Sequence, residues 1–226
     1  MIGDKAHVYK IERAGLSSIG NIYPISIKNH EDGTIDLDEV RYNCLPQDPH
    51  LPVPRVIALE SSHNLCNGRV LRMDYIREVK KICDENNFKL HLDGARCLNA
   101  CTFLKIDPSE LAKDFNTISL CFSKGLSCPF GTAVIGSHEE IERAKVIRKM
   151  LGGAMRQGGI MASACRISLE DWKEHLQRDH DNAQYLAREL AKNNELVIDL
   201  EGIETNIIRF TFQEDFKKFE KYSDFS

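Results

Sequence analysis

The chain has 226 residues, of which 42% are hydrophobic and 28% are charged, with 30 basic against 34 acidic side chains and a net charge of −4. This composition is typical of a folded globular protein that buries its own core. The small negative charge gives no reason to expect a nucleic-acid partner or an anionic membrane surface. No apolar run approaches the roughly 20 residues that a membrane helix needs, and the first residues resemble neither a secretory signal nor a transit peptide.

Eight cysteines are scattered along the chain without a Cys-x-x-Cys pair, so a zinc site is not expected. Several lie among apolar neighbours, such as Cys121 between Leu120 and Phe122, and are interpreted as small buried hydrophobic residues. A reducing compartment suits this cysteine usage better than a disulfide framework does. The sequence therefore predicts a cytoplasmic protein.

The secondary structure predicted in chain order begins with a connecting loop over residues 43–55, which holds four prolines. Strands and helices alternate after it. The strands are predicted at 55–60, 88–92, 117–122 and 132–135, and the helices at 73–87 and 139–151, with short helical turns at 100–111. This alternation predicts an α/β fold with a mostly parallel sheet.

The alternation ends near residue 164. A long helical stretch is predicted at 161–193, with a break near Gln177, and strands of a second layer are predicted at 196–200 and 206–212. We expect residues 1–164 to form part of a large domain and residues 165–226 to form part of a small C-terminal α+β domain.

Asp93 follows an apolar strand, in a position where a carboxylate contributes nothing to packing. Ligands of open α/β sheets bind outside the carboxyl ends of the strands. Asp93 could hold a pyridine nitrogen protonated, with Gly94 and Ala95 leaving space for a flat group, or it could cap the next helix. Arg96 could bind a substrate carboxylate as a bidentate pair or form an ion pair with Asp93.

Lys124 follows the next predicted strand, between Ser123 and Gly125. A lysine at the mouth of a buried sheet is partly desolvated, which frees its amine for imine formation, although many such lysines only extend toward solvent. Together with Asp93 it supplies the minimal equipment for pyridoxal 5′-phosphate chemistry, a lysine that bonds the cofactor and a carboxylate for its pyridine nitrogen.

Three further residues are candidates with structural alternatives. His7 and His63 could stack on a ring or move a proton near neutral pH, and each alone is more often a structural histidine. Arg156 follows the glycine pair Gly152 and Gly153, which suggests a tight turn with a close approach. A lone arginine in such a loop is usually part of a weak surface ion pair.

Together these motifs resemble the low-specificity threonine aldolases, which have the aspartate aminotransferase-like fold (fold type I). The matching segments are Gly3-Asp-x-Ala-His7, Glu60-Ser-Ser-His-Asn64, His91-Leu-Asp-Gly-Ala-Arg96, Phe122-Ser-Lys-Gly-Leu126 and Arg148-Lys-Met-Leu-Gly-Gly-Ala-Met-Arg-Gln157. They occur in the family's order and spacing.

The resemblance implies a role for each candidate residue and a reaction for the protein. Lys124 would bind pyridoxal 5′-phosphate covalently, Asp93 would pair with the pyridine nitrogen, and His7 would stack on the ring. His63 would lie near the substrate hydroxyl and Arg96 would hold the substrate carboxylate. Arg156 would reach a cofactor phosphate in a neighbouring subunit of a homodimer or homotetramer. The reaction would be retro-aldol cleavage of threonine or allo-threonine to glycine and an aldehyde.

The chain also departs from the family pattern at both ends. It is expected to begin inside the cofactor domain, without the glycine-rich turn that binds the phosphate at a helix N-terminus. It is expected to end early, with the charged segment 213–221 where the family continues to a further arginine. Two readings stay open, a working aldolase of amino-acid metabolism and a catalytically defective isoform or fragment that acts as a non-enzymatic subunit.

Overall fold

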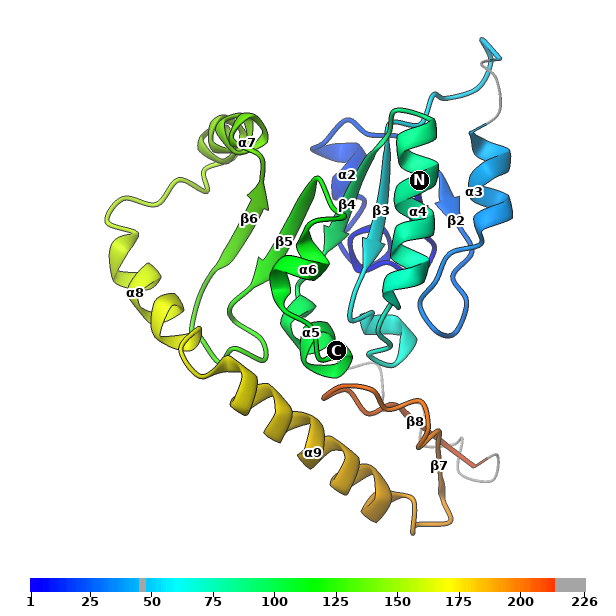
Figure 1. The fold of residues 1–226 in the computed structure, drawn as a ribbon, viewed down its shortest axis with the longest axis vertical. Coiled ribbons are helices and arrows are strands. Elements are labelled where there is room, and N and C mark those ends of the chain that lie inside the picture. The colour runs from blue at the N-terminus through cyan, green and yellow to red at the C-terminus, as the bar shows by residue number, and fades with distance from the viewer. Residues whose placement is uncertain (45–47, 214–226) are drawn as a thin grey trace.

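The structure is a computed structural model that describes residues 1–44 and 48–213. A six-stranded sheet forms its centre in the order β2-β1-β3-β4-β5-β6 (Figure 1). The first five strands in this order are parallel and β6 is antiparallel to β5. The strands are β1 (Ile2–Gly3), β2 (Ser26–Ile27), β3 (Val56–Glu60), β4 (Lys89–Asp93), β5 (Thr117–Cys121) and β6 (Thr132–Gly136). The predicted mostly parallel sheet is confirmed.

One face of the sheet packs on helices. Leu59 on β3 is in register with Leu92 on β4, and both are buried. Helix α4 covers them with an apolar stripe at helical spacing, while α5 and α6 cover the neighbouring strands (Figure 1). The helices are α4 (Met73–Glu85), α5 (Cys97–Leu104) and α6 (Pro108–Ala112). This side holds the main hydrophobic core.

The opposite face of the same strands carries polar side chains. The alternation of a strand places Glu60, Asp93 and Ser119 side by side, since these three residues are in register on β3, β4 and β5. His91 lies two residues earlier on β4, on the same face, and contacts Thr117, with 2.8 Å between Nδ1 and Oγ1. These polar and titratable side chains of β3, β4 and β5 therefore share the face of the sheet opposite α4.

Five short elements near the N-terminus were not predicted. β1 and β2 have two residues each, and three helices lie around them, α1 (His7–Lys10), α2 (Gly15–Ser18) and α3 (Leu37–Asn43). The two-residue strands and the four-residue helices α1 and α2 are too short to show a period in the sequence, and α3 has only seven residues. β1 is nevertheless an internal strand, because it pairs with both β2 and β3. Of the predicted loop over residues 43–55, residues 45–47 lie outside the described part of the chain.

The C-terminal part contains α7 (His138–Met150), α8 (Gly159–Ser168), α9 (Trp172–Leu190) and a separate pair of strands, β7 (Leu196–Ile198) and β8 (Phe210–Phe212). The predicted break near Gln177 is wrong. That residue lies inside α9, where its amide donates to Asp181 at 2.9 Å, and the helices separate at residues 169–171 instead. The strand predicted at 206–212 is shorter than expected, since only its last three residues pair with β7.

The predicted domain boundary at residue 164 falls within α8 and stays a prediction. Residues 214–226 of the predicted C-terminal domain, including most of the charged segment 213–221, lie outside the described residues. Within residues 1–44 and 48–213, no helix combines the length and apolar character needed to cross a membrane.

Glu204 ties the C-terminal segment to the loop before α4. Its side chain is 7% exposed and accepts hydrogen bonds from the guanidinium groups of Arg69 at 3.1 Å and Arg72 at 2.6 Å. It also accepts from the Val70 backbone N–H at 2.7 Å. Buried carboxylates are stable when they are paired and hydrogen-bonded in this way. The cluster fixes residues 199–205 against the segment that leads into α4.

A buried histidine joins α9 to α5. The Asn99 amide of α5 donates to His180 Nε2 of α9 at 3.1 Å, so this nitrogen accepts and is not protonated. Burial lowers the pKa of His180, and the nearby Asp179 and Asp181 oppose that shift less strongly. Burial also lowers the pKa values of His63 and His91.

We therefore expect the free energy of unfolding to decrease as the pH is lowered through the histidine range. Because these folded-state pKa values lie below the ordinary histidine value, the unfolded chain binds more protons as the pH drops from about 7 toward 5. The stability that these neutral histidines contribute is complete above the pKa of histidine in the unfolded chain. It is lost as the pH falls from that value toward their lower folded-state pKa values. Urea unfolding at a series of pH values measures the effect. His180→Gln should flatten the dependence, while His138→Gln, a change at an exposed residue, should leave it unchanged. Equal slopes in the wild type and His180→Gln would contradict the assignment.

Candidate active site

Asp93 ends β4 at the carboxyl edge of the sheet. Its Oδ1 accepts from the Ala95 backbone N–H at 3.2 Å, and α5 begins only at Cys97 with Arg96 as its cap residue. Asp93 therefore does not cap α5, and its carboxylate has this one local hydrogen bond among the described residues. The space expected beside Gly94 is filled. A Cβ there would lie 2.8 Å from Ile118 and 2.9 Å from the Ser119 carbonyl oxygen, so this glycine serves close packing of β4 on β5 and leaves no gap for a ligand.

Lys124 lies three residues beyond β5, the neighbour of β4, so it shares the carboxyl edge with Asp93. Its turn is closed by the Ser127 N–H, which donates to the Lys124 carbonyl oxygen at 2.8 Å. Gly125 packs against α9, because a Cβ there would lie 2.7 Å from a methyl group of Leu176. The predicted desolvation of Lys124 is wrong for the described part of the chain. Its side chain is exposed.

A buried carboxylate that the sequence analysis did not single out lies next to these residues. Glu60 ends β3 and accepts from two backbone N–H groups, that of His7 at 2.8 Å and that of Asn64 at 2.8 Å. Its Oε1 is 3.9 Å from His63 Nδ1. Glu60 therefore holds the backbone beside both candidate histidines. The signal was present, because Glu60 follows an apolar strand in the same manner as Asp93.

His63 is 1% exposed, and Gly33 lies against it so closely that a Cβ there would be 3.1 Å from His63 Cβ. Within the described residues its Nδ1 has no hydrogen-bond partner. Burial lowers the pKa of His63, and the negative charges of Glu60 and Asp93 oppose this shift without reversing it. The imidazole is therefore neutral near pH 7 and has a free ring nitrogen.

Glu60→Gln should lower the pKa of His63 further. The substitution removes a negative charge that favours the protonated ring, while burial, the dominant cause of the shift, remains. One amide oxygen can replace only one of the two acceptor atoms, so we also expect a loss of about 1–3 kcal/mol in the free energy of unfolding. An NMR titration of the ring protons measures the pKa directly. A rise in the pKa of His63 would refute the described electrostatics.

His7 begins α1 and its ring is about one-third exposed. Its Nε2 lies 2.8 Å from Glu12 Oε1, so the ring is held toward a carboxylate. Arg96 is half-buried, and among the described residues no ion pair joins it to Asp93. Arg156 is exposed in the connection between α7 and α8, away from the ends of β4 and β5 (Figure 1). Within one chain, the fold places His7, His63 and Asp93 around Glu60 and puts Lys124 beyond the end of the neighbouring strand β5, whereas Arg156 lies in the connection between α7 and α8.

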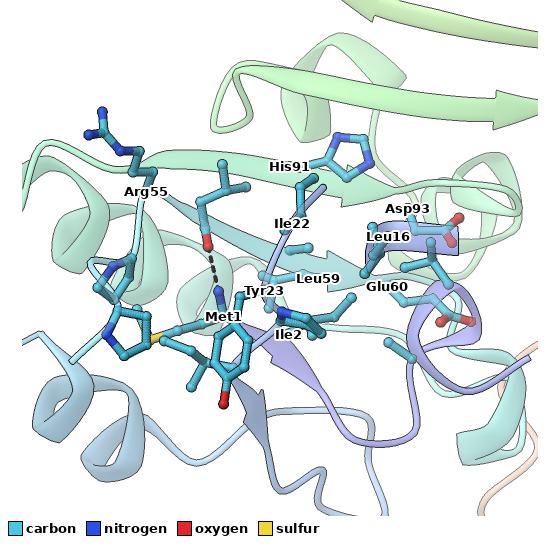
Figure 2. A pocket seen from close by; sticks show the side chains of 18 of the residues that line it. Met1, Ile2, Leu16, Ile22, Tyr23, Arg55, Leu59, Glu60, His91 and Asp93 are labelled. Carbon is cyan, nitrogen blue, oxygen red and sulfur yellow. Dashed lines mark hydrogen bonds between the residues drawn. The ribbon is translucent and has the colours of Figure 1, made fainter. Parts of the chain in front are cut away.

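A cavity of about 680 Å³ opens on the polar face of the sheet. Figure 2 shows Glu60 and Asp93 close together at one end and Arg55 at the other, with His91 on the strand between them. Most of the remaining lining is apolar and comes from the N-terminal segment, including Ile2 and Tyr23. Pockets of this size, mainly apolar with a few convergent polar groups, are typical of small-molecule sites. Of the six predicted site residues, Asp93 lines this cavity.

The mostly parallel sheet with its antiparallel edge strand has the architecture of the fold type I class of pyridoxal phosphate-dependent enzymes. A crystal structure from Listeria monocytogenes, described as a candidate L-allo-threonine aldolase, has a TM-score of 0.79 at 19% identity and covers 93% of this chain and 57% of its own. Leishmania major threonine aldolase has a TM-score of 0.74 at 14% identity and covers 100% of this chain and 66% of its own. At these identities the likeness concerns the fold.

The sequence profile of the beta-eliminating lyase family matches residues 1–213, and the chain belongs to that family. Low-specificity L-threonine aldolase 1 of Arabidopsis thaliana is 37% identical over 212 residues, which are 92% of this chain and 59% of the relative. The low-specificity L-threonine aldolase of Escherichia coli K12 is 38% identical over 190 residues, 84% of this chain and 56% of the relative. The chain thus spans somewhat more than half the length of these relatives.

Proposed function

We propose that this chain belongs to a pyridoxal 5′-phosphate-dependent carbon–carbon lyase that cleaves threonine or allo-threonine to glycine and acetaldehyde. The observation that carries the proposal is the position of Asp93 and Lys124 after neighbouring parallel strands, beside a buried neutral histidine. The family match and the threonine aldolase relatives support the same reaction class. Free thiols throughout the described chain suit a cytoplasmic enzyme.

The residues present fit this cofactor. A carboxylate at the strand edge can hold a pyridine nitrogen in its protonated form, and an exposed lysine amine one strand away can bond a carbonyl carbon. When bound, the cofactor supplies an electron sink for cleavage of the Cα–Cβ bond. We assign Asp93 to the pyridine nitrogen, Lys124 to the covalent bond and His7 to the face of the ring.

The remaining residues act on the substrate in this proposal. Arg96 offers a guanidinium for a bidentate bond with the substrate carboxylate. His63 Nδ1 lacks a partner among the described residues, and its neutral ring can accept the proton of the β-hydroxyl group. Glu60 accepts from the Asn64 backbone N–H and so holds the backbone directly after this histidine in place. Arg156 would serve a cofactor phosphate in a neighbouring subunit of a homodimer or homotetramer.

A second candidate function is that of a non-enzymatic subunit. Helix α7 and the turn after it expose large apolar side chains, including Val146 at 60%, Met150 at 79% and Leu151 at 63%. Such a surface is suited to cover by another polypeptide. In this reading the chain contributes structure to an assembly whose other members complete the site.

Incubation of the purified chain with pyridoxal 5′-phosphate and either L-threonine or L-allo-threonine separates the two functions. Glycine and acetaldehyde should form in equal amounts and in proportion to the protein concentration. Absence of both products with each substrate, in a preparation that is folded by circular dichroism, would favour the non-enzymatic subunit.

A further inference from the structure

Two thiols meet between the β5–β6 connection and α8. Cys128 Sγ and Cys165 Sγ are 3.5 Å apart although 37 residues separate them in sequence. Both approach the Phe130 carbonyl oxygen, at 3.2 Å from Cys128 and 3.5 Å from Cys165. Gly131 makes room for this contact, because a Cβ there would lie 3.2 Å from Cys165 Sγ. The β5–β6 connection therefore contacts α8 through the sulfur atoms of these two cysteines.

Cys165 is half-buried, as are Cys44 and Cys121, and Cys128 is buried, but the Cys128–Cys165 pair has its sulfur atoms in contact. Cys97 and Cys101 are both buried in α5, where burial raises the pKa of each to about 12. Cys165 is only half-buried, so a small reagent can reach it. A disulfide bond is about 2.05 Å long, so the two sulfur atoms need to approach by about 1.5 Å. Side-chain rotation of the half-buried Cys165 is the natural way to achieve this.

The same connection carries Lys124. The Cys128 backbone N–H donates to the Phe122 carbonyl oxygen at 3.0 Å, and the Ser127 N–H donates to that of Lys124. Lys124 thus lies in a turn that these two bonds close directly before Cys128. Helix α8, on the other side of the sulfur contact, has no buried residue of its own. A covalent bond at this point would fix a loosely packed helix to the turn of Lys124.

We propose that Cys128 and Cys165 form a reversible disulfide that fixes the turn of Lys124 against α8. The oxidant is a small-molecule disulfide such as oxidised glutathione. The Cys165 thiolate attacks one sulfur of the oxidant, which gives a mixed disulfide and releases one small thiol. The Cys128 thiolate then attacks Cys165 Sγ, forms the new bond and releases the second small thiol. Two protein thiols are oxidised, one small disulfide is reduced, and both protons end on the released thiols.

The expected pH dependence follows from the attacking group. Partial burial and the contact with Cys128 raise the pKa of Cys165, so its thiolate is scarce near neutral pH. The cross-link should therefore form faster as the pH rises from about 7 to 9. A small reductant returns both thiols by the reverse steps.

The test uses the full chain in buffers of reduced and oxidised glutathione, quenched by alkylation. Peptide mapping without reduction should join the peptides of Cys128 and Cys165 and leave the other cysteines alkylated. Cys165→Ser should abolish the cross-link, whereas Cys97→Ser should leave it unchanged. Cross-links at other cysteines, mixed disulfides alone, or a Cys128–Cys165 bond that forms only in urea would overturn the proposal.

The effect on Lys124 rests on the proposed function and needs a separate readout. Borohydride trapping of pyridoxal 5′-phosphate on Lys124 should be several-fold slower in the cross-linked chain than in the reduced chain. Equal rates would overturn the proposed action on the turn. Failure of Lys124 to react in either state would reject the proposed cofactor site. Peptide mapping would still show independently whether the Cys128–Cys165 disulfide forms.

Discussion

Asp93→Asn is expected to reduce the turnover of threonine or allo-threonine by at least about 100-fold, the effect that removal of one electrostatic group commonly has in an active site. The side chain keeps its shape, and its oxygen can still accept from the Ala95 backbone N–H. What it loses is the negative charge that would hold a pyridine nitrogen in its protonated form. The fold should therefore persist while the chemistry fails. The measurement is kcat/KM for glycine formation.

A matched control comes from the other edge of the sheet. Asp114 is half-buried and precedes β5, so Asp114→Asn makes the same chemical change far from the carboxyl ends of the strands. It should leave turnover within about twofold, in line with the small effect of changes away from a site. A second readout, the affinity for pyridoxal 5′-phosphate, should fall for Asp93→Asn alone. Equal losses in both variants would remove the special role of Asp93.

Glu204→Ala is expected to lower the free energy of unfolding by about 3 kcal/mol. Removal of one partner from a buried ion pair commonly costs about 3–5 kcal/mol, and the low end applies because Arg72 is 48% exposed. The substitution leaves the Val70 backbone N–H without its acceptor and Arg69 without its closer carboxylate. Urea unfolding should show a lower midpoint with an unchanged slope.

Asp199→Asn provides the comparison for this cluster. Asp199 meets Arg69 at 3.3 Å but is 62% exposed, and exposed pairs contribute about 0–1 kcal/mol. The asparagine can still accept from the Gly202 backbone N–H, so this variant changes only the surface ion pair. A destabilisation by Asp199→Asn as large as that by Glu204→Ala would show that burial does not decide the energetics of the cluster.

The sequence predicted the central strands from their short apolar runs and α4 from its clear helical period, whereas Ile147 of α7, which was expected to face inward, is 53% exposed. α4 buries Ile76, Val79 and Cys83 at the spacing that the sequence analysis used. The end of α8 was missed because residues 169–171 contain neither glycine nor proline, so nothing in the local sequence marks the break. β1 and β2 depend on pairing with distant strands and have no period of their own.

The positions of candidate residues at strand ends were predictable from the sequence. Their burial was not, because it depends on which distant segments pack over them. The positions of Asp93 and Lys124 at one edge follow from two neighbouring parallel strands. The exposure of Lys124 and the deep burial of His63 depend on which segments pack over each residue. Glu60 was missed although it follows an apolar strand, because its bonds with the backbone N–H groups of His7 and Asn64 exist only in the folded chain.

The most direct test of the cofactor site is the visible absorbance of the chain with pyridoxal 5′-phosphate, followed by borohydride reduction and peptide mapping. We expect an absorbance band that borohydride removes and a reduced adduct on Lys124. The adduct should vanish in Lys124→Ala and persist in Lys113→Ala, which changes another exposed lysine. An adduct spread over surface lysines, or an unchanged band in Lys124→Ala, would contradict the assignment of Lys124 as the cofactor lysine.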